Sequence, residues 1–234
     1  MWEVRTIERE EACELLLLNR NFLYQLFYKA FAREPDVAFL EILTGENTGE
    51  SFALLGGEVL EAVPAYLDEL RRELQKPDML VRLKEEYTRL FVGPALTQAP
   101  PWESVYVGEE GMLFQESTLK VREFYRRFGL LPKEIRRVAD DSLALELGFM
   151  AELSKRSVDA WEGRDRKALT KTLQGAMAFL TEHLLIWVPE LRKKAGEGET
   201  NLLYPRLLCI LDSFLIKDAE TLQDLLSEGV NAHD

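Results

Sequence analysis

Histidine and cysteine, which supply many metal ligands and catalytic nucleophiles, are scarce in this chain of 234 residues. The chain has two histidines, His183 and His233, and two cysteines, Cys13 and Cys209. It has no Glu-x-x-His pair and no HExxH, GxSxG, GxxxxGKS, GxxxxGKT or CxxC pattern. These absences argue against a di-iron bundle, a zinc protease, an α/β-hydrolase, a phosphate-binding loop and a redox-active cysteine pair. We expect no catalytic residue, no metal site and no cofactor, and two buried thiols in a reducing compartment.

An excess of basic charge is also missing. The net charge is −12 and the isoelectric point is near 4.9, which argues against nucleic acid as the main partner. An acidic surface is compatible with a basic peptide partner. No apolar run approaches the length of a membrane span, and residues 1–21 have acids around their leucine run and no small-residue cleavage site. We therefore expect a soluble cytoplasmic protein without a signal peptide and without membrane insertion.

The chain shows no sustained alternation of apolar and polar residues, which is the pattern of a half-buried strand. Apolar residues recur at helical spacing instead. Leu15, Leu18, Phe22 and Leu26 predict one apolar face of a first long helix that ends before Pro35. Further helices are predicted over residues 59–74, 77–91, 117–128, 132–138, 143–153, 164–187 and 202–226, with a loop at 44–50. The predicted fold class is all-α, a single compact bundle of about ten helices.

Several residues are expected to mark helix ends. Gly129 is a plausible C-cap, Asp140 or Asp141 can cap the helix that follows, and Pro189 is expected to stop another. A proline-rich hinge at 94–113 is expected to join a helical half at 1–93 to a second at 114–234. No linker is long enough to separate two domains, so one domain over residues 1–234 is predicted.

The segment Glu86–Tyr106, EYTRLFVGPALTQAPPWESVY, carries the most information. It begins with helical spacing, and its three prolines then make the rest stiff and irregular. On that stiff part lie Trp102, Ser104 and Tyr106, two large amphipathic rings around a hydroxyl. Such rings are either a plug for the core or a recognition surface.

Two acids, Asp141 and Glu146, lie in the strongly apolar run DSLALELGFM. As structural residues they would be an N-cap and a helix-face residue, and as functional residues they would supply charge to a site. His183 lies on a helix beside Leu184 and Trp187, where a packed, hydrogen-bonded role is favoured over catalysis.

Three stretches resemble the TorD/DmsD/NarJ family of cytoplasmic chaperones for molybdenum-containing oxidoreductases. The segment from Tyr87 to Tyr106 resembles the family's signature. The run Asp141–Met150 is similar to its Asp-His-x-x-x-Glu-Leu-x-Phe-Met helix, and Phe179–Trp187 to its Phe-Leu-x-x-His-Leu-x-x-Trp helix. The three matches occur in the family's order.

The resemblance implies a non-enzymatic chaperone that binds the twin-arginine leader or N-terminal segment of a molybdopterin oxidoreductase subunit. Its partner would be that apoprotein and its signal peptide, and the chaperone would be a monomer or a homodimer. A leader has a basic region followed by an apolar stretch, so its receptor needs an apolar groove with acidic groups at the edge. The peptide-binding residues expected from the resemblance are Trp102, Glu103, Ser104, Tyr106, Asp141, Ser142 and Glu146.

Three departures from the family pattern point to an unusual client. Ser142 replaces the family's histidine, Val138-Ala139 replaces its Glu-Pro, and Gly148 stands where many relatives have a second acid. The alternative functions are a helical nucleotide-binding protein or enzyme using the same pocket, and a purely structural role in which Trp102 and Tyr106 fill the core.

Overall fold

The computed structural model describes residues 2–92, 97–108, 116–131, 139–198 and 200–229. All regular elements in these ranges are helices, which confirms the predicted all-α bundle. The α-helices are α1 (Trp2–Ala32), α2 (Val37–Leu43), α3 (Glu46–Ala53), α4 (Glu58–Glu61), α5 (Val63–Glu73), α6 (Met79–Tyr87), α7 (Glu103–Val107), α8 (Glu116–Arg127), α9 (Leu143–Glu162), α10 (Arg166–Phe179), α11 (Leu185–Gly196) and α12 (Tyr204–Asp224). Short π-helical turns span Thr88–Val92, Leu180–Leu184 and Leu225–Gly229.

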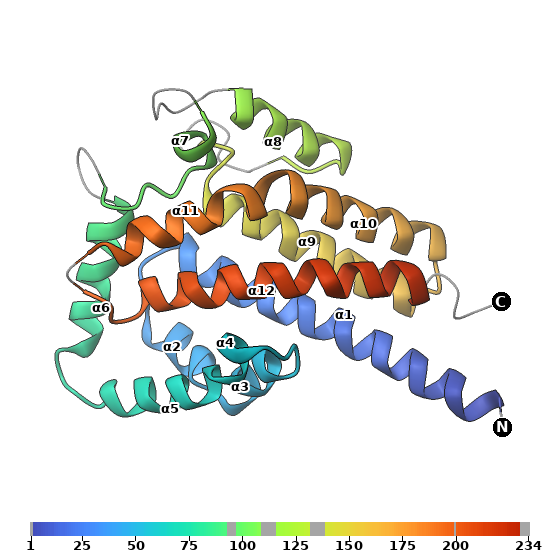
Figure 1. Cartoon of the computed structure of the whole chain (residues 1–234), viewed down its shortest axis with the longest axis horizontal. Helices are drawn as coiled ribbons and strands as arrows, with labels where there is room; N and C mark the ends of the chain where they lie inside the picture. The colour runs from blue at the N-terminus through green and yellow to red at the C-terminus, as the bar shows by residue number, and fades with distance from the viewer. Residues whose placement is uncertain (1, 93–96, 109–115, 132–138, 199, 230–234) are drawn as a thin grey trace.

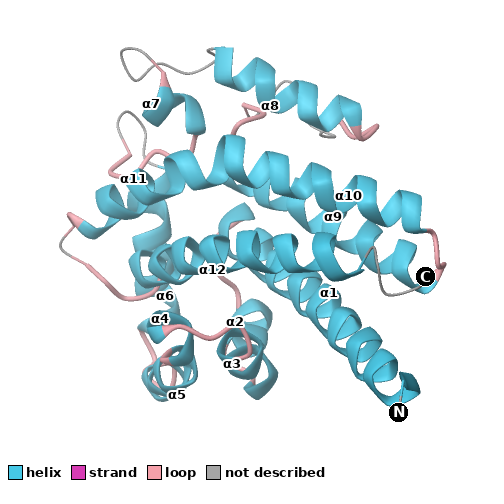
Figure 2. Cartoon of the chain, turned by 45° about the vertical axis from the view of Figure 1, so that its right-hand side comes forward, coloured by secondary structure: helices cyan, strands magenta, loops and turns pink. Residues whose placement is uncertain are grey.

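The long helices α1, α9, α10, α11 and α12 lie side by side and form the body of the molecule (Figure 1). The short helices α2–α5 cover one side of this body, and α7 and α8 lie on the opposite side (Figure 2). Helix α1 packs along α9 and also contacts α12, so buried side chains from the first half of the chain join one core with those of the second. The division of the chain at 94–113 remains a prediction. No helix in the described ranges is long and apolar enough to cross a membrane.

The predicted apolar face of α1 is wrong in its outer part. Leu15 and Leu18 are 51% and 44% exposed, whereas Leu17 and Phe27 are 1% exposed and belong to the core. The run of four leucines offers apolar residues on every side of the helix, so periodicity alone cannot choose the buried side. The packing of α1 against α9 and α12 makes that choice.

The loop predicted at 44–50 is also wrong, because α3 begins at Glu46. Its Gly, Thr and Asn residues have low helix propensity, but Phe52 is completely buried and anchors the helix in the core. Gly49 permits this packing, since a Cβ there would lie 3.2 Å from the Cα of Pro64. Tertiary contacts here override local propensity.

Helix boundaries were predicted with mixed success. Gly129 does end α8: its φ is +67°, its N–H bonds the Arg126 carbonyl at 2.9 Å, and the Leu130 N–H bonds the Tyr125 carbonyl at 2.8 Å. Pro189, predicted to stop a helix, lies inside α11. The α-helical ladder is instead interrupted upstream, by the π-turn Leu180–Leu184. The helix expected at 132–138 lies outside the described residues.

Candidate functional site

The segment before α7 and the segment before α9 are joined by backbone hydrogen bonds. Trp102 and Ser142 form an antiparallel bridge. The Glu103 N–H donates to the Asp141 carbonyl at 3.0 Å, and the Leu143 N–H donates to the Pro101 carbonyl at 2.9 Å. Two stretches that resemble the family signature therefore meet in space, although about forty positions separate them in the chain.

Asp141 stabilises the start of α7 rather than the start of α9. Its carboxylate accepts a hydrogen bond from the Ser104 N–H at 2.9 Å, and its side chain is completely buried. The predicted cap of α9 by Asp140 or Asp141 is wrong, because the Ser142 hydroxyl accepts from the Leu145 N–H. Ser142 directly precedes the first helical residue and has the extended backbone that an N-cap requires. The aspartate before it is free to reach α7.

The stretch Trp102–Tyr106 is not the irregular proline loop predicted from the sequence. Residues Glu103–Val107 form the short helix α7, with Trp102 at its N-cap position. The prolines at 100 and 101 precede this helix and cannot interrupt it. The N–H groups of Glu103 and Ser104 donate hydrogen bonds to the carbonyl and the carboxylate of Asp141. These bonds explain how so short a helix is stabilised.

Asp140 connects the same junction to α8. Arg122 forms an ion pair with the buried Asp140 carboxylate, and the Tyr125 hydroxyl donates to the Asp140 carbonyl at 2.9 Å. The sequence identified Asp140 only as a possible cap, because nothing in the local pattern pointed to a partner on α8. Helices α7, α8 and α9 thus converge on residues 140–142.

Glu103 and His183 form a buried pair behind α7. The His183 Nδ1 lies 2.8 Å from a Glu103 carboxylate oxygen, and both residues are less than 5% exposed. The imidazole stacks on Phe179 at 4.8 Å and meets the edge of Phe124 at 5.3 Å. The packed, hydrogen-bonded role predicted for His183 is confirmed. The pair ties α7 to the π-turn between α10 and α11.

Glu146 and Trp187 form a second buried contact next to this pair. The Trp187 Nε1–H donates to a Glu146 carboxylate oxygen at 3.0 Å, and Tyr106 of α7 stacks on the Trp187 ring at 5.6 Å. Burial raises the pKa of Glu146 well above its usual 4.5, and the charge of Glu103 raises it further. Glu146 is thus not the helix-face residue of the structural interpretation. It belongs to the buried network beneath Tyr106.

Replacement of Glu146 by glutamine is expected to increase stability at pH 8 and to leave it unchanged at pH 4. The pKa of Glu146 is higher in the folded state than in the unfolded state, so folding favours the protonated carboxyl. Its contribution to stability is therefore complete below about pH 4.5 and is lost as the pH rises through the folded-state pKa. Glutamine cannot ionise and retains an oxygen for the Trp187 N–H.

The measurement is the free energy of unfolding in urea at several pH values. Glu162→Gln, at an exposed position of the same helix, is the control and should show no such divergence from wild type. An equal effect of Glu146→Gln at pH 4 and pH 8 would contradict the expected ionisation.

An apolar groove of about 710 Å³ lies between α1 and α9 and is also lined by Ser142 and by the segment that follows α8. We call it the α1–α9 groove; it is lined by Gln25, Tyr28, Ala32, Tyr125, Leu130, Leu131, Ser142, Ala144, Leu145, Gly148, Phe149, Ala151 and Glu152. The Tyr28 ring lies over Gly148, where a Cβ would approach it to 3.2 Å. A larger side chain at this position would meet the Tyr28 ring. Gly148 therefore leaves room for Tyr28 in this groove.

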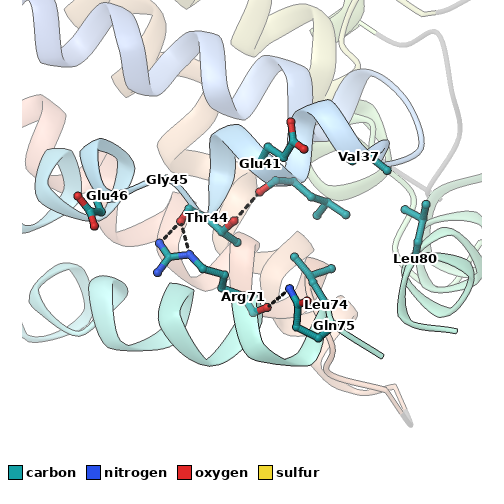
Figure 3. Close-up of a pocket in the computed structure, with 10 residues that line it drawn as sticks. Val37, Glu41, Thr44, Gly45, Glu46, Arg71, Leu74, Gln75 and Leu80 are labelled. Carbon is teal, nitrogen blue, oxygen red and sulfur yellow. Dashed lines mark hydrogen bonds between the residues drawn. The ribbon is translucent and has the colours of Figure 1, made fainter. Parts of the chain in front are cut away.

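A second hollow, of about 690 Å³, lies among α2, α5 and the start of α6 (Figure 3). The Arg71 guanidinium, which lines this hollow, donates hydrogen bonds to the Thr44 carbonyl and to the Asp68 carboxylate. The Thr44 hydroxyl donates to the Leu40 carbonyl at 2.8 Å. Because these polar groups are satisfied within the protein, the hollow offers fewer groups to orient a ligand than its volume suggests. The described residues also contain no group of three or more His, Cys, Asp or Glu side chains that could hold a metal ion.

Comparison with known proteins identifies the family of this chain. The family model described as nitrate reductase delta subunit matches residues 57–193. The chain belongs to this family. It is 26% identical to the chaperone protein TorD of Vibrio vulnificus (strain YJ016), over 95% of this chain and 99% of that protein. It is 28% identical to the chaperone protein TorD of Shewanella pealeana, over 89% of this chain and 91% of that protein.

Membership of the nitrate reductase delta subunit family confirms the resemblance seen in the sequence. The relatives are named chaperones, which agrees with the expectation of a maturation protein and not an enzyme. The match over residues 57–193 includes the α7–α9 junction and the Glu146–Trp187 contact.

The structure brings the seven expected peptide-binding residues together but buries most of them. Glu103, Ser104, Asp141, Ser142 and Glu146 are at most 5% exposed, and only Trp102 and Tyr106 are half-buried. The carboxylates of Glu103, Asp141 and Glu146 are bonded to His183, Ser104 and Trp187. A direct contact between these acids and a leader remains a prediction. Sequence reasoning missed Arg122 and Tyr28, whose contacts depend on how the helices pack.

Proposed function

We propose that this protein is a cytoplasmic chaperone that binds the twin-arginine leader or N-terminal segment of a molybdopterin oxidoreductase subunit. Binding would hold that subunit until its cofactor is inserted and before it is exported or assembled. Family membership supports the chaperone role, and the chaperone names of relatives that align over most of the chain support it further.

The observation that carries the proposal is the α1–α9 groove. Its walls come from α1, α9 and the segment after α8, and they are mainly aliphatic and aromatic side chains. The apolar stretch of a leader could bury several large side chains there, and each fully buried one contributes about 1.5–3 kcal/mol. The groove is also lined by Ser142, which stands where the resemblance places the family's histidine.

Five of the seven expected residues divide into two roles in this proposal. Trp102 and Tyr106 present half-buried rings at the edge of the junction. The buried residues Asp141, Ser142 and Glu103 hold α7 against α9 and the π-turn, and so fix where those rings lie. An aromatic ring that is held in one orientation loses little conformational entropy when a peptide binds.

Isothermal titration with leader peptides of molybdenum oxidoreductases encoded beside this protein tests the proposal. Leu131→Glu places a charge in the groove at a residue that is 57% exposed, and it is expected to weaken leader binding at least tenfold. Leu119→Glu is the control, because Leu119 is 60% exposed on α8 and does not line the groove. If the folded wild-type protein binds no such leader and no such apoprotein, the proposed function is wrong.

A further inference from the structure

Helix α1 has an exposed apolar stripe that the bundle leaves uncovered. We call Leu15, Leu18, Phe22 and Tyr28 the α1 stripe. Leu15, Leu18 and Tyr28 are 51%, 44% and 38% exposed, and Phe22 is half-buried. Leu15, Leu18 and Phe22 are separated by three and four residues, which is the spacing of apolar residues on a helix that packs against another helix. The outer part of α1 also projects beyond the other helices (Figures 1 and 2).

The α1 stripe is continuous with the α1–α9 groove. Tyr28 belongs to both, and Gln25 and Ala32 of the same helix also line the groove. Apolar side chains therefore recur along α1 from the groove outward to Leu15, with the polar Gln25 between Tyr28 and Phe22. Exposed apolar residues that adjoin a groove favour one extended binding surface over two separate ones.

The outer end of this surface is acidic. Glu8, Glu11 and Glu14 precede the α1 stripe, are exposed, and have no ion-pair partner among the described residues. Arg9 lies in the same turns, but it is about 160° around the helix from Glu11. These free carboxylates differ from those of Glu103, Asp141 and Glu146, which are buried and bonded within the protein.

We infer that a leader peptide binds along α1 as a helix that runs parallel to it. This inference rests on the proposed function and adds the position and direction of the peptide. The leader's N-terminal cations contact Glu8, Glu11 and Glu14, and its apolar stretch covers the α1 stripe and enters the α1–α9 groove. From Glu11 to Ala32 the surface is about 32 Å long, which matches a helix of about 20 residues.

Charge and shape both favour this occupant. A leader has cations followed by an apolar stretch, in the same order as the acids and the apolar residues of α1. An amphipathic helix in an apolar groove is a common form of peptide recognition. A second copy of this chain would place the acidic ends of two α1 helices near each other if the helices were parallel.

Titration of a leader into variants of the outer surface tests the inference. Leu18→Glu and the double change Glu11→Lys/Glu14→Lys are each expected to weaken binding at least tenfold at low salt. The controls are Ile216→Glu, at an exposed position of α12, and Glu46→Lys/Glu50→Lys, an exposed pair on α3 with the same change in charge. The controls are expected to stay within twofold of wild type.

The direction of the peptide requires a separate measurement. A photo-reactive residue beside the leader's arginines should crosslink to residues 8–18, and one at the end of its apolar stretch should crosslink to Leu131 or Leu145. The opposite crosslinks would overturn the parallel orientation.

The outcomes separate this inference from the proposed function. If the wild type binds the leader and both outer variants bind equally well, the α1 surface is not used, although the proposed function stands. If Leu18→Glu converts a dimer to a monomer and leaves leader affinity unchanged, the stripe is a contact between copies and the inference is wrong. If the wild type binds no leader, both proposals fail.

Discussion

Replacement of Asp218 by alanine is expected to lower the free energy of unfolding by about 3–5 kcal/mol, because it leaves a buried cation without a counter-ion. Arg20 on α1 and Asp218 on α12 are each 1% exposed. Two guanidinium nitrogens of Arg20 bond to the Asp218 carboxylate, and the Tyr24 hydroxyl donates to it at 2.6 Å. The substitution therefore strands a charge and a hydroxyl in the interior at once.

Two further variants distinguish the cost of leaving Arg20 without a counter-ion from the net contribution of the buried ion pair to stability. Glu220→Ala breaks the exposed Lys217–Glu220 pair on the same helix and should change stability by less than about 1 kcal/mol. The triple change Arg20→Met/Tyr24→Phe/Asp218→Leu removes every polar member of the cluster. It should recover most of the lost stability, because a buried ion pair often contributes no more than well-packed apolar side chains.

Urea denaturation of the three variants gives the required free energies. If the free energies of unfolding of Asp218→Ala and Glu220→Ala differ by less than about 1 kcal/mol, then Arg20 finds another partner or reaches water. In that case the cluster does not hold α1 against α12 as the structure indicates.

The helical class and the sequence positions of the long helices could be predicted from the sequence. Apolar spacing near 3.6 residues places the helices that became α1, α9, α10 and α12, and local signals such as Gly129 place some of their ends. These features depend on residues close together in the chain. The predictions succeed where local chemistry and tertiary packing agree.

The errors have a common physical cause, which is that contacts between distant residues override local preference. α3 forms because Phe52 is buried, and α7 forms because Asp141 accepts its first N–H groups. The exposed side of α1 follows from the position of α9 and α12, and four consecutive leucines cannot reveal it. Single-sequence patterns carry no information on which distant segment will pack against a helix.

The candidate site shows the same division. The sequence placed Glu103, Asp141 and Glu146 in one site through the family resemblance, and the structure does bring them together. The sequence did not show that Glu103, Asp141 and Glu146 are bonded to His183, Ser104 and Trp187, respectively. Glu8, Glu11 and Glu14, the exposed acids proposed to contact a cationic peptide, lie on α1 and outside the stretches that carry the family resemblance.

Glu86 holds the start of α12 and has the second large expected effect. Its carboxylate accepts hydrogen bonds from the N–H groups of Leu202, Leu203 and Tyr204 at 2.8–2.9 Å. The side chain of Glu86 is 1% exposed, and α12 has no cap from its own preceding residues. A negative charge at a helix N-terminus is also favoured by the helix dipole.

Glu86→Ala is expected to lower the free energy of unfolding by about 3 kcal/mol or more, since each buried N–H without a partner costs about 1–3 kcal/mol. Glu86→Gln retains one carbonyl acceptor and loses the charge, so its loss should be about half as large. Glu85→Ala is the matched control, because Glu85 is exposed on the adjacent position of α6, and it should change stability by less than about 0.5 kcal/mol. Amide hydrogen exchange locates the effect. Protection should fall first in residues 202–208 of the Glu86 variants, and uniform loss across the bundle would instead mean that Glu86 stabilises the core without capping α12.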